Sequence, residues 1–355
     1  MAEVPAGENS LMIKLTETVQ KGGCAAKLPA GTLRQFLGGL QMKRPPELVV
    51  GTENLDDACL YELGGGTALV QTLDFFTPIV DDAEDFGAIA AANAISDVYA
   101  MGGKPVTALS ILAFPSQTLP LDLLEPLMRG ALSKIEESGA CLAGGHTIDD
   151  ETLKLGFSVT GLVKTSEAWR NDGARPGDAL ILTKGLGTGT ITTALKIREA
   201  KPEWIEAAVS SMKQLNRTEG LLSGIDVHAA TDVTGFGLAG HGLQVARASK
   251  VGFEIRLADL PVLPGARECI EEGEMLNRAH KTNGEYTQTE CSWSEGAGWA
   301  RWLTLDPQTS GGLLLSVPAD QAARAVEQLK ARFPRTAQIG SVTEPPSSGP
   351  RVRFI

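Results

Sequence analysis

The apolar residues available for a core in this chain are almost all aliphatic. Hydrophobic residues make up 43% of the 355-residue sequence, but aromatic residues only 5%. A core must therefore be built from Ala, Val, Leu and Ile, which suits layered α/β architectures better than an aromatic-rich β-sandwich. At roughly 150 residues per domain, the length favours two domains.

Segments with the character of strands and helices alternate in both halves of the sequence. In the first half we expect strands over 48–51, 58–63, 68–73, 104–114, 141–143 and 155–163, and helices over 32–40, 86–101 and 121–138. Gly64–Gly66 separates two of these strands and predicts a hairpin. In the second half we expect strands over 179–183, near 229, and over 313–317 and 338–342, and helices over 188–199, 203–223, 236–248 and 319–333.

A turn-rich stretch, NDGARPGD at 171–178, marks the expected domain boundary. We therefore divide the chain into an arm with a short helix (1–45), a first α/β domain (46–170) and a second α/β domain (171–355). Residues 274–300 show no clear period, and we expect no particular element there.

Charge and cysteine usage exclude several classes of function. The net charge of −11 gives no general attraction to nucleic acid or an anionic membrane. No apolar run approaches the roughly 18 residues of a membrane span, and the first ten residues lack the apolar core of a secretory signal. The five cysteines form no CxxC pair, so a reducing, cytoplasmic location is expected.

Aspartates gather at the ends of the expected strands. Asp56 and Asp57 precede one strand, Asp74 follows its hairpin partner, and Asp232 follows a strand of the second half. Asp97 lies four residues after an asparagine on an otherwise apolar helix, so both side chains share one face. Oxygen ligands of this kind favour Mg²⁺, which typically bridges carboxylates and substrate phosphates. The alternative is that each Asp is a turn residue or pairs with a lysine.

Glycine-rich segments supply a second group of candidates. In KGGCAAKL, two glycines precede Cys24, and Lys27 follows; such an arm can cradle phosphate and close over a substrate, or it is a frayed terminus with an incidental thiol. Expected turns at 144–147 and 185–189 can bind phosphate through backbone N–H groups, or can simply begin the next element. DPQTSGG at 306–312 is by itself a structural turn.

Taken together, these segments resemble the selenophosphate synthetase family of the aminoimidazole-ribonucleotide synthetase superfamily. The resemblance begins near Gly22 and runs to the C-terminus, on GGCAAK, NLDDACLY, TLDFFTPIVDD, DFGAIAAANAISDVYAMGGKP, LAGGHTID, TKGLGTG, ATDVTGFGLAGH and DPQTSGGLLL. It implies an α/β (α+β) fold of two domains, in which the first domains pair as a homodimer with a shared barrel of strands. It also implies the conversion of ATP, selenide and water to selenophosphate, AMP and phosphate.

The resemblance assigns roles to individual residues. It implies catalytic roles for Cys24 and Lys27 and Mg²⁺ ligation by Asp57, Asp97 and Asp232. Contacts with ATP are implied for Lys27, Asn54, Leu55, Asp56, Asp74, Asp97, Gly145, His146 and Thr147. The implied partners are ATP and selenide, the latter free or brought by a selenium-delivery protein, and the need for a monovalent cation stays open.

The sequence departs from the family pattern in the arm. Many bacterial members carry a second Cys two residues after the first, where this chain has Ala26. A relay between two arm thiols is therefore not available here. Two alternatives stay open: another kinase of the superfamily, such as thiamine-monophosphate kinase or a hydrogenase-maturation ATPase, or a binding protein without turnover. Neither calls for the Cys24–Lys27 arm.

Overall fold

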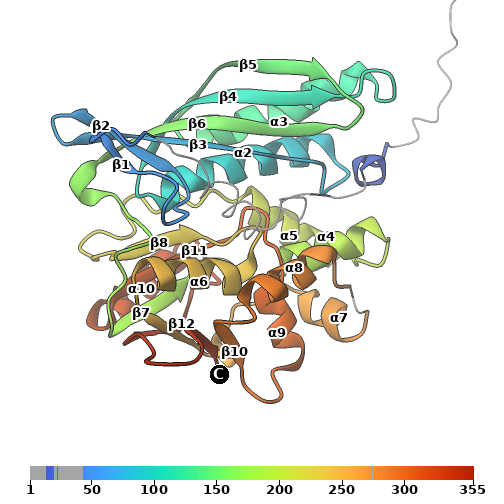
Figure 1. The fold of residues 1–355 in the computed structure, drawn as a ribbon. Coiled ribbons are helices and arrows are strands. Elements are labelled where there is room, and N and C mark those ends of the chain that lie inside the picture. Colours follow the sequence, from blue (N-terminus) through green and yellow to red (C-terminus); the bar gives the residue numbers. More distant parts are fainter. Residues whose placement is uncertain (1–12, 20–21, 23–42, 274) are drawn as a thin grey trace, which may run out of the picture.

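A computed structural model describes residues 13–19, 22, 43–273 and 275–355. Two β-sheets lie in separate halves of the molecule, one in the upper and one in the lower part of Figure 1. Two helices of the first half lie between the first sheet and the second half. The mixed α/β fold class is confirmed. The helix expected over 32–40 lies outside the described residues.

In the described part of the chain, the first sheet has six strands. In their order across the sheet they are β1 (Leu48–Val50), β2 (Cys59–Gly64), β3 (Thr67–Phe76), β6 (Lys154–Lys164), β4 (Lys104–Phe114) and β5 (Cys141–Asp149). β2 and β3 form the expected hairpin, with Leu60 opposite Val70. β5 is an edge strand and runs parallel to β4.

Helices α2 (Ala83–Ala100) and α3 (Leu124–Glu137) cover the inner face of this sheet. Nearly all of α2 is buried because it has the sheet on one side and the second half on the other. The two helices cross closely at glycines: a Cβ on Gly87 would lie 1.8 Å from the Leu127 carbonyl oxygen. Short 3₁₀ segments η1 (Leu15–Thr18), η3 (Leu121–Leu123) and η4 (Thr165–Glu167) complete this half.

The outer face of the first sheet is exposed in the single chain, although it carries large apolar side chains. These are Tyr61, Leu63, Leu73, Phe75, Val106, Leu109, Ile148 and Leu162. On β3 the burial alternates strictly from Thr67 onward, so one row of side chains faces α2 and the other faces outward.

The second sheet has seven strands among the described residues and is covered far more completely. Its order is β10 (Cys291–Trp293), β13 (Val352–Phe354), β9 (Gly252–Ile255), β12 (Ala337–Thr343), β7 (Asp178–Leu182), β11 (Leu313–Pro318) and β8 (Ala229–Asp232). Every residue of β7 and β8 is buried. Asp232 therefore ends an edge strand inside the protein, as the sequence predicts.

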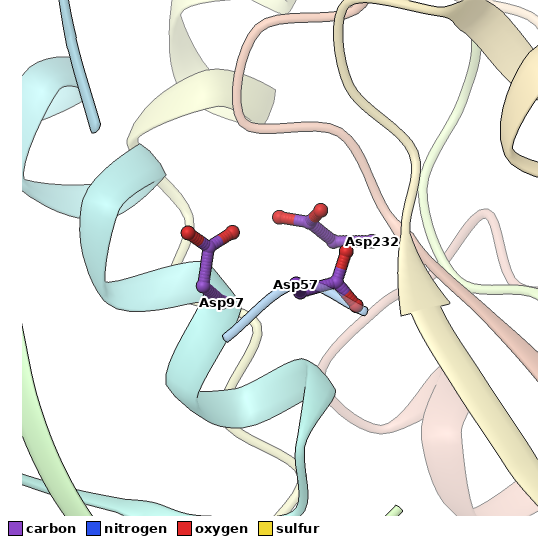
Figure 2. Close-up of side chains that lie close together, drawn as sticks. All are labelled: Asp57, Asp97 and Asp232. Carbon is purple, nitrogen blue, oxygen red and sulfur yellow. The ribbon is translucent and has the colours of Figure 1, made fainter. Parts of the chain in front are cut away.

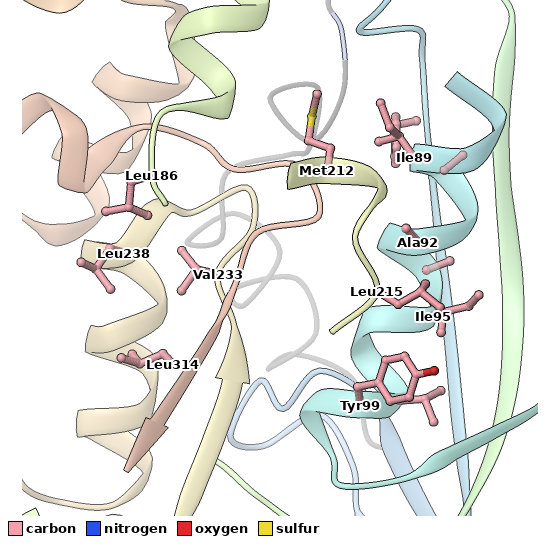
Figure 3. Close-up of a cluster of buried hydrophobic side chains, with 14 of the residues drawn as sticks. Ile89, Ala92, Ile95, Tyr99, Leu186, Met212, Leu215, Val233, Leu238 and Leu314 are labelled. Carbon is pink, nitrogen blue, oxygen red and sulfur yellow. The ribbon is translucent and has the colours of Figure 1, made fainter. Parts of the chain in front are cut away.

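Helices surround this second sheet. They are α4 (Thr188–Lys196), α5 (Pro202–Lys213), α6 (Gly237–Ala248), α7 (Ala266–Glu271), α8 (Arg278–Thr287), α9 (Gly298–Leu305) and α10 (Ala319–Lys330), with η5 (Leu257–Asp259) as a single 3₁₀ turn. Figure 3 shows how α2 joins this half: Ile89, Ile95 and Tyr99 of α2 face Met212 and Leu215. One continuous apolar core thus runs from the first sheet into the second half.

Two expectations about the second half are wrong. The helix expected over 203–223 ends at Lys213, because the side chain and backbone of Gln214 form hydrogen bonds with other parts of the fold. Residues 274–300 contain all of α8, all of β10 and the start of α9. Among the described residues, no helix combines the length and apolar character needed to cross a bilayer.

Candidate active site

Three carboxylates from distant parts of the sequence meet where the two halves join. Asp57 precedes β2, Asp97 lies on α2 and Asp232 ends β8, and one oxygen of each lies within 4.8 Å of the others. Figure 2 shows the three side chains pointing toward one another. The arrangement offers a cation a set of hard oxygen ligands from both halves of the chain.

The electrostatics of this cluster are unfavourable without a cation. Burial raises the pKa of Asp57 well above its usual range, and the neighbouring charges of Asp232 and Asp97 raise it further. Two full charges 4.8 Å apart repel by about 3.5 kcal/mol at an effective dielectric constant near 20. A divalent cation removes this repulsion and favours the ionised form of all three carboxyl groups.

Two threonines that sequence reasoning missed orient the carboxylates. Thr72 Oγ1 donates to Asp97 Oδ2 at 2.5 Å, and Thr231 Oγ1 donates to Asp57 Oδ1 at 2.9 Å. The second oxygen of Asp57 is buried and accepts no hydrogen bond from any described residue. An orphaned carboxylate oxygen inside a ring of acidic groups fits a site for a cation.

Asp74 lies beside the cluster and accepts a hydrogen bond from a side chain of α2. Its Oδ2 accepts a 2.5 Å hydrogen bond from Asn93 Nδ2, and Asn93 Oδ1 accepts one from the backbone N–H of Ser310 at 2.7 Å. Asn93 and Asp97 therefore share one face of α2, as their spacing predicts. Asp74 lies within β3, two residues before the strand ends, and not at the strand end as expected.

Asn54, Leu55 and Asp56 form a short segment that is fixed by Asn171. The Asn171 backbone N–H donates to Asp56 Oδ1 at 2.8 Å, and its side chain donates to the carbonyl oxygens of Asn54 and Leu55. Burial raises the pKa of Asp56, and the hydrogen bond from Asn171 opposes that shift. Leu55 has a φ of 54°, a strained conformation for a residue with a side chain.

Gly145, His146 and Thr147 do not join the carboxylates within one chain. The turn expected there is wrong: these residues lie in the exposed edge strand β5, which contains a β-bulge after Leu142. β5 is three strands away from β3 in the sheet order, which corresponds to about 14 Å.

The glycine-rich segment 185–189 begins α4, and its N–H groups are already occupied. Gln308 Oε1 accepts from the backbone N–H groups of Gly187 and Thr188, and Asp306 Oδ2 accepts from that of Gly189. DPQTSGG is therefore more than a turn, because its side chains cap a helix more than a hundred residues away in sequence. This leaves few free donors at that helix terminus for a phosphate.

Cys24 and Lys27 lie outside the described residues. The described segment that precedes them is tied to both halves of the molecule. Thr16 donates to Asp81 Oδ1, and Arg198 forms ion pairs with Glu17 and Asp81. The arm (1–45) is thus anchored at Thr16 and Glu17, which precede Cys24 and Lys27 in the sequence.

Family comparisons agree with this architecture. AIR synthase related protein, N-terminal domain, matches residues 55–163, and AIR synthase related protein, C-terminal domain, matches residues 175–353. The solved structure of thiamine-monophosphate kinase from Stenotrophomonas maltophilia has a TM-score of 0.63 at 22% identity, covering 92% of this chain and 96% of that one. A structure of the hydrogenase maturation protein HypE in complex with ATP has a TM-score of 0.59 at 20% identity, covering 90% and 88%. At these identities the likeness shows the fold.

Curated relatives are considerably more similar in sequence. The selenide, water dikinase of Bdellovibrio bacteriovorus is 50% identical over 339 residues, which is 94% of this chain and 96% of the relative. That of Nitrosomonas eutropha is 48% identical over 334 residues, 93% and 95% of the two chains. With both family domains present and identity sustained over nearly the whole length, the chain belongs to the selenide, water dikinase family.

Proposed function

We propose that this protein is a selenide, water dikinase that makes selenophosphate, AMP and phosphate from ATP, selenide and water. The observation that carries the proposal is the cluster of three carboxylates from both halves, in a chain 50% identical to a relative of that name. Phosphoryl transfer depends on positioning and charge neutralisation more than on covalent chemistry. Selenide is itself a strong nucleophile, so the site requires no strong general base.

Asp57, Asp97 and Asp232 would hold Mg²⁺ in this proposal. The fit rests on the buried Asp57 oxygen without a hydrogen-bond partner among the described residues and on the oxygen-only donor set. When bound, Mg²⁺ supplies neutralisation of the charge on the phosphates. The protein's own part is to fix the carboxylates, through Thr72 and Thr231.

We assign Asn54, Leu55, Asp56 and Asp74 to ATP contacts, because they border the carboxylate cluster. The proposal gives Lys27 the role of neutralising the terminal phosphate. It gives Cys24 the role of presenting selenium or ordering the arm. Release of AMP in place of ADP requires a closed site with an ordered water.

A homodimer is the second part of the proposal. A single chain exposes a sheet face with Leu73, Phe75, Leu109 and Ile148, whose exposed fractions are 53%, 46%, 46% and 49%. Contiguous apolar surface of this kind marks an interaction site. A second copy on this face would also cover the region of β5, so Gly145, His146 and Thr147 would act in a site completed by the partner copy.

The deciding experiment is anaerobic ³¹P NMR of the protein with ATP, Mg²⁺ and selenide. We expect a selenophosphate resonance together with AMP and phosphate in equal amounts. Accumulation of ADP without selenophosphate would overturn the proposal and direct the search to other acceptors, thiamine monophosphate first. Adding K⁺ or Na⁺, and then a selenium-delivery protein, tests the two components that the sequence leaves open.

The role of Cys24 has its own test. Cys24→Ala is expected to abolish selenide-dependent turnover while the protein still binds nucleotide. Cys269→Ala is the matched control, because Cys269 is a free thiol on α7, outside the exposed sheet face and β5. Turnover at the wild-type rate in Cys24→Ala would remove Cys24 from the mechanism.

We also propose the division into domains at 46–170 and 171–355, with the turn-rich stretch 171–178 as its boundary.

A further inference from the structure

Lys184 is a buried lysine that the mechanism above does not use. It lies two residues after the end of β7, and only 3% of its surface is exposed. Its Nζ donates to two backbone carbonyl oxygens, that of Gln214 at 2.6 Å and that of Ser310 at 2.8 Å. Neither acceptor carries a charge. Through these two hydrogen bonds, the lysine connects the loop after α5 to the loop that contains Ser310.

Ser310 connects this lysine to the carboxylate cluster. The same residue whose carbonyl oxygen Lys184 binds donates its N–H to Asn93, and Asn93 donates to Asp74. Ser310 has a φ of 48°, in the left-handed region that a residue with a side chain adopts only when its surroundings hold it there. The hydrogen bond from Lys184 is one of the contacts that hold it.

The loop around Ser310 is packed too closely to find another position easily. A Cβ on Gly312 would lie 2.4 Å from the Lys184 backbone nitrogen, and one on Gly311 would lie 1.9 Å from the Val233 carbonyl oxygen. Asn216 adds a parallel connection to α2, since its side chain donates to both Gly311 O and Ser96 Oγ. The position of Asn93 is therefore coupled to the loop at 306–312.

The charge of Lys184 also matters to the acidic cluster. Burial lowers the pKa of Lys184 to about 7, and the nearby charge of Asp232 opposes that shift. The protonated lysine is thus favoured by one of the carboxylates that we assign to Mg²⁺. The hydrogen bonds of Lys184 lead through Ser310 and Asn93 to Asp74, and its charge interacts with Asp232. Both connect the lysine to the carboxylate site.

We propose that Lys184 is a positioning residue for nucleotide binding. It fixes Ser310, whose N–H orients Asn93, and Asn93 in turn orients the carboxylate of Asp74. The lysine acts through the loop and touches no substrate. This inference rests on the proposed function only in placing Asp74 on the nucleotide side of the site.

The test is the affinity for a non-hydrolysable ATP analogue with Mg²⁺, measured by calorimetry on the full chain. Lys184→Met, which keeps the length and loses the donors, is expected to weaken binding at least tenfold. Lys184→Arg, which keeps the charge and the donors, is expected to restore most of the affinity. Binding by Lys184→Met at the wild-type affinity would overturn the proposal.

Thr190→Val is the matched control for a general loss of stability. It removes a buried 2.8 Å hydrogen bond to Asp306, at the opposite end of the same loop. We expect a lower Tm and an unchanged affinity for the analogue. An equal loss of affinity in Thr190→Val and Lys184→Met would show that the lysine only stabilises the loop, and would overturn the positioning role.

A double-mutant comparison keeps the proposal testable if Lys184→Met folds poorly. In the Asn93→Ala background the relay is already cut, so adding Lys184→Gln should change affinity less than twofold. Additive losses would contradict a common route through Asn93. The analogue binds without selenide, so failure of wild-type selenophosphate formation would remove the proposed function and leave this comparison intact.

Discussion

The two halves of the molecule bury their sheets in different ways. The first sheet is covered by α2 and α3 on one face and exposes an apolar face on the other. In the second sheet, β7 and β8 are buried along their whole length, and most of β11 is buried as well. A single chain thus leaves one face of the first sheet uncovered, whereas these strands of the second sheet are covered within the chain, in part by α2.

This difference matters for the site between them. The second half supplies Asp232 and the loop at 306–312 from a fully packed framework. The first half supplies Asp57, Asp74 and Asp97 from a sheet and helix with one open side. If two chains assemble as proposed, the exposed face through which they do so belongs to the half that supplies these three carboxylates.

The largest expected effect comes from removing one carboxylate from each half. Asp97→Asn and Asp232→Asn should each lower turnover at least about 100-fold, or ~2.7 kcal/mol, because each removes a charge from the proposed Mg²⁺ site. Asp226→Asn, at an exposed position bonded to Gln321, is the control and should leave turnover unchanged. A large loss in only one of the two variants, measured by AMP formation, would show that a single half holds the cation.

The exposed sheet face gives the next effect. Leu73→Glu with Phe75→Glu places charges in the apolar face, so the proposed dimer should dissociate in sedimentation velocity, with a Kd at least about 100-fold higher. Leu121→Glu, at an exposed residue in η3 away from this face, should leave assembly unchanged. A wild-type protein that sediments as a monomer would contradict the proposal that a second copy covers the apolar face.

The dependence of thermal stability on pH should reveal the repulsion between Asp57 and the carboxylates of Asp97 and Asp232. The raised pKa of Asp57 means that the folded chain holds this proton to a higher pH than the unfolded chain does. Without metal, stability from this group is present at low pH and is lost as the pH rises from about 4 through the raised pKa. Mg²⁺ should therefore raise the Tm more at pH 8 than at pH 5.5. Asp57→Asn should remove most of that difference, and equal shifts at both pH values would contradict the assignment.

The smallest expected effect comes from a helix cap that lies wholly within the second half. Gln308→Ala removes the side chain that caps α4, which should cost about 1–2 kcal/mol in the free energy of unfolding. Because the cap lies within the second half, the oligomeric state should not change. Urea unfolding followed by circular dichroism measures the first quantity and sedimentation the second. A changed oligomeric state would show that the two halves are not independent in this respect.

Local patterns predicted much of the fold. The hairpin around Gly64–Gly66 and the strand over 104–114 follow from alternation and turn residues, and both are present. Segment 274–300 was missed because α8 buries small and polar side chains, among them His280 and Asn283, and so lacks an apolar stripe. The capping box of Asn277 and His280 was the available local signal.

The candidate site was predictable in its acidic members but not in their supports. The sequence singles out three carboxylates, those of Asp57, Asp97 and Asp232. Carboxylates at strand ends and on an apolar helix are costly to bury without a counter-charge. Ser310, Asn171 and Lys184 act through backbone groups of distant segments, and no local pattern reveals such contacts. The expected turn at 144–147 is a bulged strand because pairing with β4 continues through it.

The edge position of β8 has a consequence for the order in which the protein forms. Among the described strands, β8 pairs only with β11, so Asp232 gains this strand neighbour when residues 313–318 are in place. On a ribosome, Asp57 and Asp97 emerge more than two hundred residues before that neighbour. A nascent chain therefore carries two of the three carboxylates long before it can bring the third to them. In the proposed function, we expect Mg²⁺ to bind only after nearly the whole chain has been made.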